Sequence, residues 1–261
     1  MAFQPDYRYG AAPGWGRTAA VDAAAIDAGL RAYMLRVYNW MASGLLLTAI
    51  VAYAIASIPE VSALFYTTVR TPRGLGVAPT ILGYIAMFAP LAFVLVLSFG
   101  INRMNKTTAQ ALFWVFAAVM GASLSNIFII YTKASIASTF FATSAMFAAM
   151  SIWGYTTKSD LTRMGMIVMM GIIGLIIVSL INIFLQSPMM AFIIGAVGVV
   201  LFCLLTAFDT QRIKNDYIEH SYAEGTDEAG KRSVMDALGL YLNFINIFQF
   251  LMQFMGARNQ E

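Results

Sequence analysis

The sequence predicts an all-α membrane protein in which seven transmembrane helices form one bundle. Of its 261 residues, 60% are hydrophobic and only 11% are charged, whereas soluble domains usually carry about 25% charged residues. Seven apolar runs each reach about 20 residues, the length that a helix needs to cross a hydrocarbon core about 30 Å thick. None of these runs contains Asp, Glu, Lys, Arg or His, so each is suited to a lipid environment.

The runs are separated by short polar segments and predict one seven-helix transmembrane domain over residues 31–257. Residues 1–30 carry charges and no long apolar core, so they predict a flexible tail rather than a signal peptide. Ser187 and Pro188 suit a helix start, because serine caps free N–H groups and proline needs no partner in the first turn. The predicted spans are 37–58, 79–99, 108–131, 134–155, 164–185, 188–208 and 237–255.

Lysine and arginine are unequally divided between the two sides of the predicted membrane. One side holds Arg8, Arg17, Arg31, Arg36, Arg103, Lys106, Lys158, Arg163, Arg212, Lys214, Lys231 and Arg232, and the other holds Arg70, Arg73, Lys133 and Arg258. This division, 12 against 4 of the 16 basic residues, predicts a cytoplasmic N-terminus, a cytoplasmic segment at 209–236 and a C-terminus outside. We therefore expect a multi-pass protein of the cell (inner) membrane with the lipid bilayer, and no nucleic acid, as its partner.

A stripe of amides runs along the last predicted helix. Asn243, Asn246, Gln249 and Gln253 are spaced by three, three and four residues, which places them on one face. Polar groups in hydrocarbon are costly unless they face protein or water, so this face should meet other helices. The stripe can serve interhelical hydrogen bonding or line a narrow polar path, and its possible partners are Asn39, Asn126 and Asn182.

Asp209 directly follows the sixth apolar run and is the sharpest polar signal in the sequence. One interpretation is a solvated carboxylate at the helix end, paired with Arg212 three residues later. The other is a carboxylate turned inward that contacts a cation or a proton, which makes Asp209 the expected metal contact. Arg212 is compatible with both.

Composition argues against several enzyme classes, and we expect no catalytic residues and no cofactor. The last predicted helix has no lysine that could hold retinal, and the single histidine, His220, lies between spans, so an intramembrane serine such as Ser123 lacks a histidine base. The same scarcity of histidine and cysteine argues against haem or zinc. Cys203 lies within an apolar run and is expected to be an inert buried thiol.

Four stretches of the chain resemble the Bax-inhibitor family, also called the transmembrane Bax inhibitor motif family, in its bacterial branch. They are YTKASIASTF at 131–140, GYTTKSDL at 154–161, LTAFDTQRIK at 205–214 and LYLNFINIF at 240–248. The resemblance extends over roughly residues 30–257. It implies a bundle of seven helices with the last helix central.

The resemblance also implies a passive, pH-sensitive Ca²⁺ leak whose gate is a pair of aspartates. Asp209 matches the first aspartate, and the second aspartate of the family falls at Asn243 in this chain. The expected gate and ion pathway therefore consists of Asp209, Asn243, Asn246 and Arg212. An amide lacks the like-charge repulsion that makes two carboxylates share a proton, so we expect altered pH gating. The alternative is a membrane regulator without transport, since some bacterial relatives are associated with a membrane AAA protease.

Overall fold

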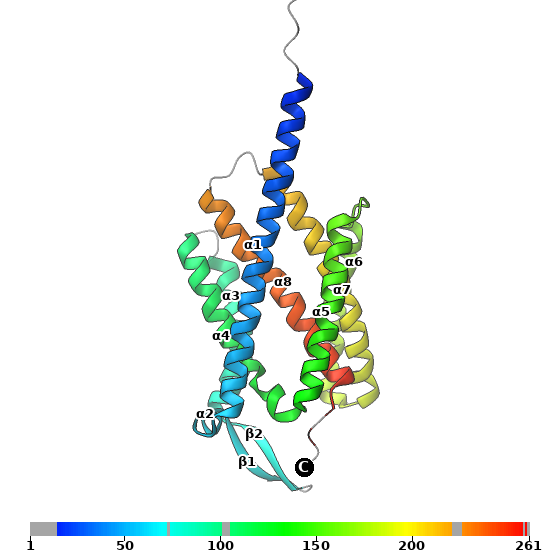
Figure 1. Cartoon of the computed structure of the whole chain (residues 1–261). Coiled ribbons are helices and arrows are strands. Elements are labelled where there is room, and N and C mark those ends of the chain that lie inside the picture. The colour runs from blue at the N-terminus through cyan, green and yellow to red at the C-terminus, as the bar shows by residue number, and fades with distance from the viewer. Residues whose placement is uncertain (1–14, 72–73, 101–104, 221–225, 258, 260–261) are drawn as a thin grey trace, which may run out of the picture.

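The computed structural model describes residues 15–71, 74–100, 105–220, 226–257 and 259 and shows a bundle of long helices with one β-hairpin (Figure 1). In chain order the elements are α1 (Trp15–Ser57), α2 (Pro59–Phe65), β1 (Tyr66–Thr71), β2 (Gly74–Pro79), α3 (Ile81–Gly100), α4 (Lys106–Ile130), α5 (Lys133–Thr156), α6 (Thr162–Leu185), α7 (Pro188–His220) and α8 (Thr226–Met255).

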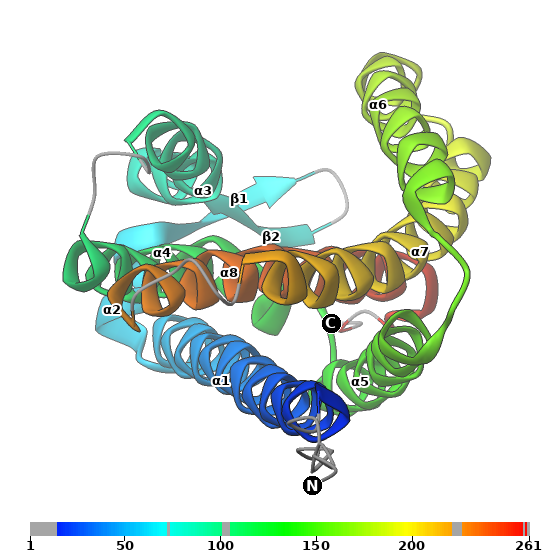
Figure 2. The ribbon, with the colours of Figure 1, turned by 90° about the horizontal axis from the view of Figure 1, so that it is seen from above.

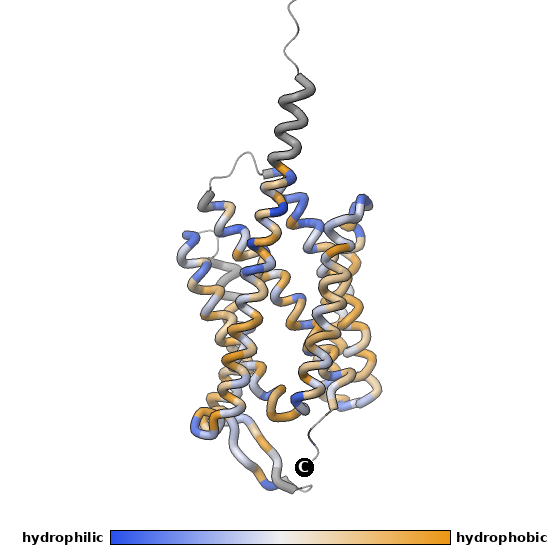
Figure 3. Tube along the Cα trace, viewed as in Figure 1, coloured by the Kyte–Doolittle hydropathy of each residue, from blue (hydrophilic) through white to orange (hydrophobic). Residues whose placement is uncertain are grey.

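Six helices among the described residues are long and apolar enough to cross a membrane, namely α1, α4, α5, α6, α7 and α8. α3 coincides with the remaining predicted span, but its apolar part with described side chains, Ile81–Val94, is shorter. Apolar residues occupy the middle of the bundle and hydrophilic residues gather toward the helix ends (Figure 3). The prediction of an all-α protein with multiple membrane-spanning helices is therefore confirmed.

Three helices extend well beyond the predicted spans. α1 begins at Trp15, so part of the expected tail continues directly into the first span. α7 continues to His220 and α8 begins at Thr226, so the segment predicted as a loop at 209–236 is mostly helical. The apolar runs marked only the lipid-facing length of these helices, because polar residues can extend a helix beyond the membrane without breaking it.

α8 contacts four other helices, α1, α4, α5 and α7 (Figure 2). It is the most buried of the six long helices. α3 packs on α4 and α6 packs on α7, so these two helices lie toward the outside. Of the four amides on α8, Asn243 is buried.

The ends of the helices are defined by side chains that satisfy free backbone groups. Asn105 accepts a hydrogen bond from the N–H of Thr108 at the start of α4, and Thr132 accepts one from Ser135 at the start of α5. Ser187 Oγ accepts the N–H of Met190 at 3.4 Å, so α7 begins at Pro188 as the sequence predicted.

The hairpin of β1 and β2 was not predicted. The strands are antiparallel, with Tyr66 opposite Pro79 and Thr71 opposite Gly74. Tyr66 Oη and Ser125 Oγ of α4 are 2.7 Å apart, and burial raises the pKa of the Tyr66 phenol despite this hydrogen bond. This contact attaches the hairpin to the end of the bundle.

α5 and α7 approach closely at Gly154. A Cβ at this position would overlap the backbone carbonyl of Ala207, which is fully buried. Small residues at helix interfaces allow this kind of close approach in membranes. By contrast, a Cβ at Gly174 of α6 would meet no atom within 4 Å.

We predict that Gly154→Ala lowers the free energy of unfolding by about 1–3 kcal/mol, the usual cost of forcing extra volume into a packed interface. Gly174→Ala is the matched control, and we expect it to be neutral or to stabilise α6 by up to about 1 kcal/mol. Unfolding of both purified variants in detergent, followed by circular dichroism, measures the difference. Equal stability of the two variants would contradict the close α5–α7 contact.

Candidate ion-pathway site

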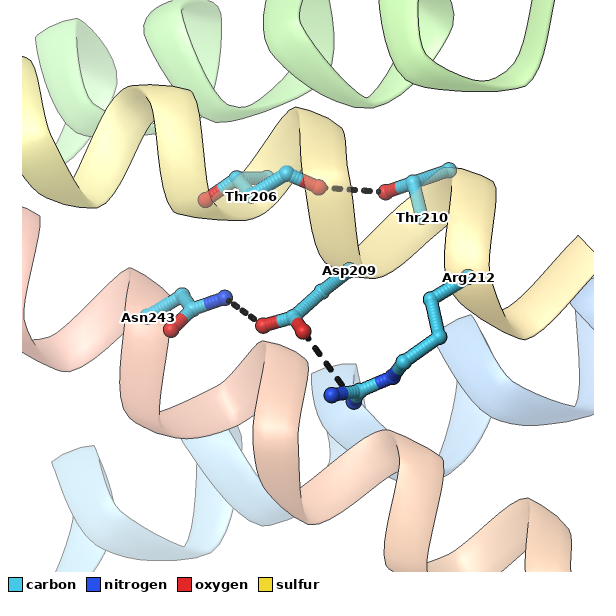
Figure 4. A network of polar contacts seen from close by, with 5 residues as sticks. All are labelled: Thr206, Asp209, Thr210, Arg212 and Asn243. Carbon is cyan, nitrogen blue, oxygen red and sulfur yellow. Dashed lines mark hydrogen bonds and ion pairs between the residues drawn. The ribbon is translucent and has the colours of Figure 1, made fainter. Parts of the chain in front are cut away.

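The site is centred on Asp209, which lies within α7 rather than at its end. Asp209 is only 6% exposed, so the interpretation of it as a solvated carboxylate at a helix end is wrong. Asn243 Nδ2 of α8 donates a 2.7 Å hydrogen bond to Asp209 Oδ2 (Figure 4). Arg212 Nη2 lies 3.0 Å from the other carboxylate oxygen. The structure thus brings three of the four predicted site residues together.

The two partners of Asp209 differ in burial. Asn243 is buried, whereas the Arg212 side chain is 47% exposed. Arg212 also lies over the ring of Phe208, 5.8 Å from its centroid. Because solvent weakens exposed ion pairs, Arg212 is the partner that can leave at lower cost, while the amide of Asn243 holds the inner side of the carboxylate.

Other residues of the 205–214 motif fasten α7 to α5 and to the link between α5 and α6. Gln211 accepts a hydrogen bond from the N–H of Leu161 and donates one to the carbonyl of Ser159, both at 2.8 Å. Lys214 Nζ donates to the carbonyl of Tyr155 at 2.8 Å. These bonds explain why the stretches at 154–161 and 205–214 occur together, since one satisfies the backbone of the other.

The link itself carries a second carboxylate, Asp160, which is exposed. Asp160 Oδ1 accepts hydrogen bonds from both N and Oγ1 of Thr162. These bonds hold the pKa of Asp160 below its ordinary value. Asp160 therefore stays ionised and supports the first turn of α6, and its carboxylate takes no part in the bonds to Asp209.

The sequence missed Asp236, a further acidic residue at the same end of the bundle. Tyr33 Oη of α1 donates a 2.6 Å hydrogen bond to Asp236 Oδ2 of α8, and Tyr33 packs on the ring of Tyr217. Asp236 precedes Asn243 by seven residues, which places both on one helix face. That spacing is the signal in the sequence, but it carries meaning only when residue 236 lies in a helix, and the apolar run of the last span begins at 237.

The sequence also missed a row of hydroxyl groups on α5. Ser135, Thr139, Thr143 and Ser151 are all buried, at spacings that are multiples of four residues. Ser151 Oγ is 3.5 Å from Thr210 Oγ1, so the row ends at the residue that follows Asp209 in α7. Buried hydroxyls are a weaker signal in a sequence than buried amides, because a hydroxyl can bond to its own helix. Thr143 does so by donating to the carbonyl of Thr139.

The amide stripe of α8 is only partly as expected. Asn246 is half-buried and donates to the carbonyl of Leu242 in its own helix, not to another helix. Gln249 is half-buried, and Gln253 is exposed, which contradicts its expected place away from lipid. Gln253 lies in the last turn of α8, which ends at Met255.

The three amides proposed as partners of the stripe are not its partners. Asn39 is exposed, and Asn182 accepts a hydrogen bond from the N–H of Ser187. Asn126 is half-buried, and no hydrogen bond to the stripe is found for it among the described residues. The side chain of His220 lies outside the described part of the chain.

Chemically, the site is one anion held by two donors. Every buried side-chain nitrogen or oxygen among the described residues has a hydrogen-bond partner, and these residues contain no group of three or more His, Cys, Asp or Glu that could hold a metal ion. Cys203 is a free, buried thiol. A cation that binds at Asp209 therefore competes with the amide and the guanidinium for the carboxylate.

The helices and this buried carboxylate define a multi-pass, all-α membrane protein. The sequence profile of the family described as "Inhibitor of apoptosis-promoting Bax1" matches residues 30–260. The chain belongs to this family, as its four motifs indicated.

Bacterial relatives cover nearly the whole chain. RP147 of Rickettsia prowazekii is 48% identical over 233 residues, which are 89% of this chain and 92% of that protein. A protein of Caulobacter vibrioides is 43% identical over 251 residues, covering 95% and 98%. "Inner membrane protein YbhL" of Escherichia coli K12 is 42% identical over 231 residues, covering 88% and 94%.

The two amides of α8 give a direct test of the geometry. We predict that Asn243→Leu costs about 1–3 kcal/mol of stability, because it leaves a buried carboxylate oxygen without a donor. Asn246→Leu should cost less, because the carbonyl of Leu242 keeps its place in the helix. Denaturant unfolding of both variants compares their free energies of unfolding. A larger loss of stability for Asn246→Leu than for Asn243→Leu would contradict the assignment of Asn243 as the amide that supports Asp209.

Proposed function

We propose that this protein is a passive Ca²⁺ leak channel of the bacterial inner membrane in which Asp209 is the ion contact and gate. The observation that supports this is a single carboxylate, buried inside a transmembrane helix, held by one neutral and one charged donor. Intramembrane carboxylates are costly, and they typically mark ion or proton pathways. The inner membrane is the location named for the Escherichia coli relative.

The proposed path follows the polar faces that meet at Asp209. The buried hydroxyls of α5 lie on one side, and Asn243 and Asn246 of α8 lie on the other. With every described buried polar atom satisfied, this arrangement is a closed state. Opening then requires a donor of Asp209 to be replaced by an ion or by water, and Arg212, whose side chain is 47% exposed, is the donor that leaves at lower cost.

The proposed topology is a seven-span bundle around α8, with α3 as the additional span and the N-terminus in the cytoplasm. Its support is the basic-residue distribution and the burial of α8. In Figure 1 the start of α1 and the C-terminus lie at opposite ends of the bundle. An odd number of spans requires such a separation.

For the topology we predict that reporter fusions at residue 225 and after Glu261 report opposite sides of the membrane, with residue 225 in the cytoplasm. The reason is the excess of basic residues on that side. Paired alkaline phosphatase and fluorescent-protein fusions measure this in cells. The same side for both fusions would replace the seven-span topology by one with an even number of spans.

For the gate we predict that Asp209→Asn lowers Ca²⁺ flux about tenfold or more, because an ion loses a charged contact of roughly 1.5–3 kcal/mol. Wild-type flux should be nearly flat between about pH 5 and 8, since no carboxylate pair shares a proton. Asn243→Asp should introduce a pH response in that range. The assay is Ca²⁺ entry into proteoliposomes that contain only the purified protein.

Asp160→Asn is the matched control, because it makes the same chemical change on an exposed carboxylate, and its flux should equal the wild-type value. Absence of flux from all four proteins would favour the alternative function, a regulator of membrane proteins such as a membrane AAA protease. A steep wild-type transition near neutral pH that Asn243→Asp leaves unchanged would place the gate elsewhere.

A further inference from the structure

α1 and α5 lie on the same side of α8 but are not among the closely packed helix pairs (Figure 2). Between them is a pocket of about 440 Å³, lined by residues of α1, α4, α5 and α8. Ligand pockets for small molecules have volumes of about 300–1,000 Å³. The space is therefore large enough for a ligand.

The interior of this pocket suits hydrocarbon. Phe244 and Ile245 of α8 form buried parts of its wall, directly after Asn243. The hydroxyl of Thr48, a polar group within the lining, is already bonded to the carbonyl of Ala117 and to Tyr241 Oη. A polar ligand would find almost no free hydrogen-bonding group inside, so burying one there would be costly.

The edge of the pocket opens toward the surface of the bundle through exposed aromatic side chains. Tyr53, Phe140 and Phe141 are all exposed and border the space. In a membrane protein these three exposed aromatic side chains face lipid chains rather than water. A partner helix is about 10 Å wide with its side chains, too broad for a pocket of this volume, whereas an acyl chain is thin and flexible.

A basic residue lies at one end of the pocket. Lys133 begins α5, and its ammonium lies 5.8 Å from the centre of the Tyr53 ring. No carboxylate among the residues with described side chains forms an ion pair with it. The N-terminal end of a helix is itself electropositive, so this end of the pocket attracts an anion.

We propose that the pocket between α1 and α5 binds one membrane phospholipid, with an acyl chain against Phe244 and the phosphate at Lys133. The hydrocarbon interior, the opening toward lipid and the single cation at the edge match the two parts of such a molecule. The lipid comes from the leaflet on the side of α2 and the hairpin, since the start of α5 lies at that end (Figure 1). This binding does not depend on ion conduction.

The test uses the purified full-length chain in vesicles of phosphatidylcholine with a trace of phosphatidylglycerol that carries a diazirine midway along one acyl chain. After photolysis, mass spectrometry locates the labelled peptides. We expect labels on the segments around Phe140 and Phe244. Ala137→Phe, which fills the pocket from α5, should lower labelling near Phe244 about tenfold, whereas Ala145→Phe, an exposed site on α5 outside the pocket, should leave it unchanged.

Ala49→Phe fills the pocket from α1 and repeats the test if Ala137→Phe does not fold. Lys133→Gln should reduce the preference for phosphatidylglycerol over an equally labelled phosphatidylcholine about fivefold, which corresponds to about 1 kcal/mol per basic residue. Equal labelling near Phe244 in the pocket-filling variant and in Ala145→Phe would overturn the pocket as the site. An unchanged lipid preference in Lys133→Gln would overturn the role of Lys133.

Discussion

A carboxylate inside a membrane protein must be neutralised or fully hydrogen-bonded, and much of this bundle is arranged around that requirement at Asp209. Desolvation of an ion costs several kcal/mol even after the protein relaxes, so both carboxylate oxygens need donors. One oxygen receives a donor from Asn243 of α8 and the other from Arg212 of α7. Because one donor comes from a different helix, satisfying the charge also fixes how α7 and α8 meet.

The stretches at 154–161 and 205–214 hold α7 in the position that this contact needs. Gly154 allows α5 to approach the backbone at Ala207, and Gln211 bonds to the link between α5 and α6. A larger residue at 154 would push α7 away from α5. The polar network and the close packing therefore depend on each other. The hydrogen bonds of Gln211 need α5 and α7 to be close, and the same bonds satisfy the backbone of the link between α5 and α6.

Sequence reasoning predicted the positions of the six long apolar helices, because membrane thickness sets a length that composition reveals, whereas α3, at the remaining predicted span, has a shorter described apolar part. It failed where polar sequence is helical: α7 continues past Asp209 to His220, and α8 begins at Thr226. The same error hid Asp236 and its hydrogen bond from Tyr33. A hydropathy pattern marks where lipid ends, and the chain continues as a helix when its own capping residues and neighbours satisfy its backbone.

For the site, the motifs placed Asp209 beside Asn243, but residue spacing alone did not. Periodicity correctly put Asn243 on a protein-facing side of α8 and was wrong for Gln253, which is exposed. Periodicity describes a face of one helix and contains no information about which helix covers it. Asn246 shows the same limit of periodicity, because the amide of Asn246 donates to the carbonyl of Leu242 in its own helix and not to another helix.

The resemblance implies a second carboxylate where this chain has Asn243, and the amide changes which partner controls access to Asp209. Two unit charges about 4 Å apart interact by about 4 kcal/mol at an effective dielectric constant of 20, and a carboxylate at 243 would add that repulsion and a second contact for a cation. The neutral amide supplies neither, and it does not titrate with pH. A cation approaching Asp209 must then displace Arg212, whose side chain is half exposed and already partly screened. On the proposed function, entry of an ion is therefore governed by competition with the guanidinium, so it depends on cation charge and ionic strength more than on protons.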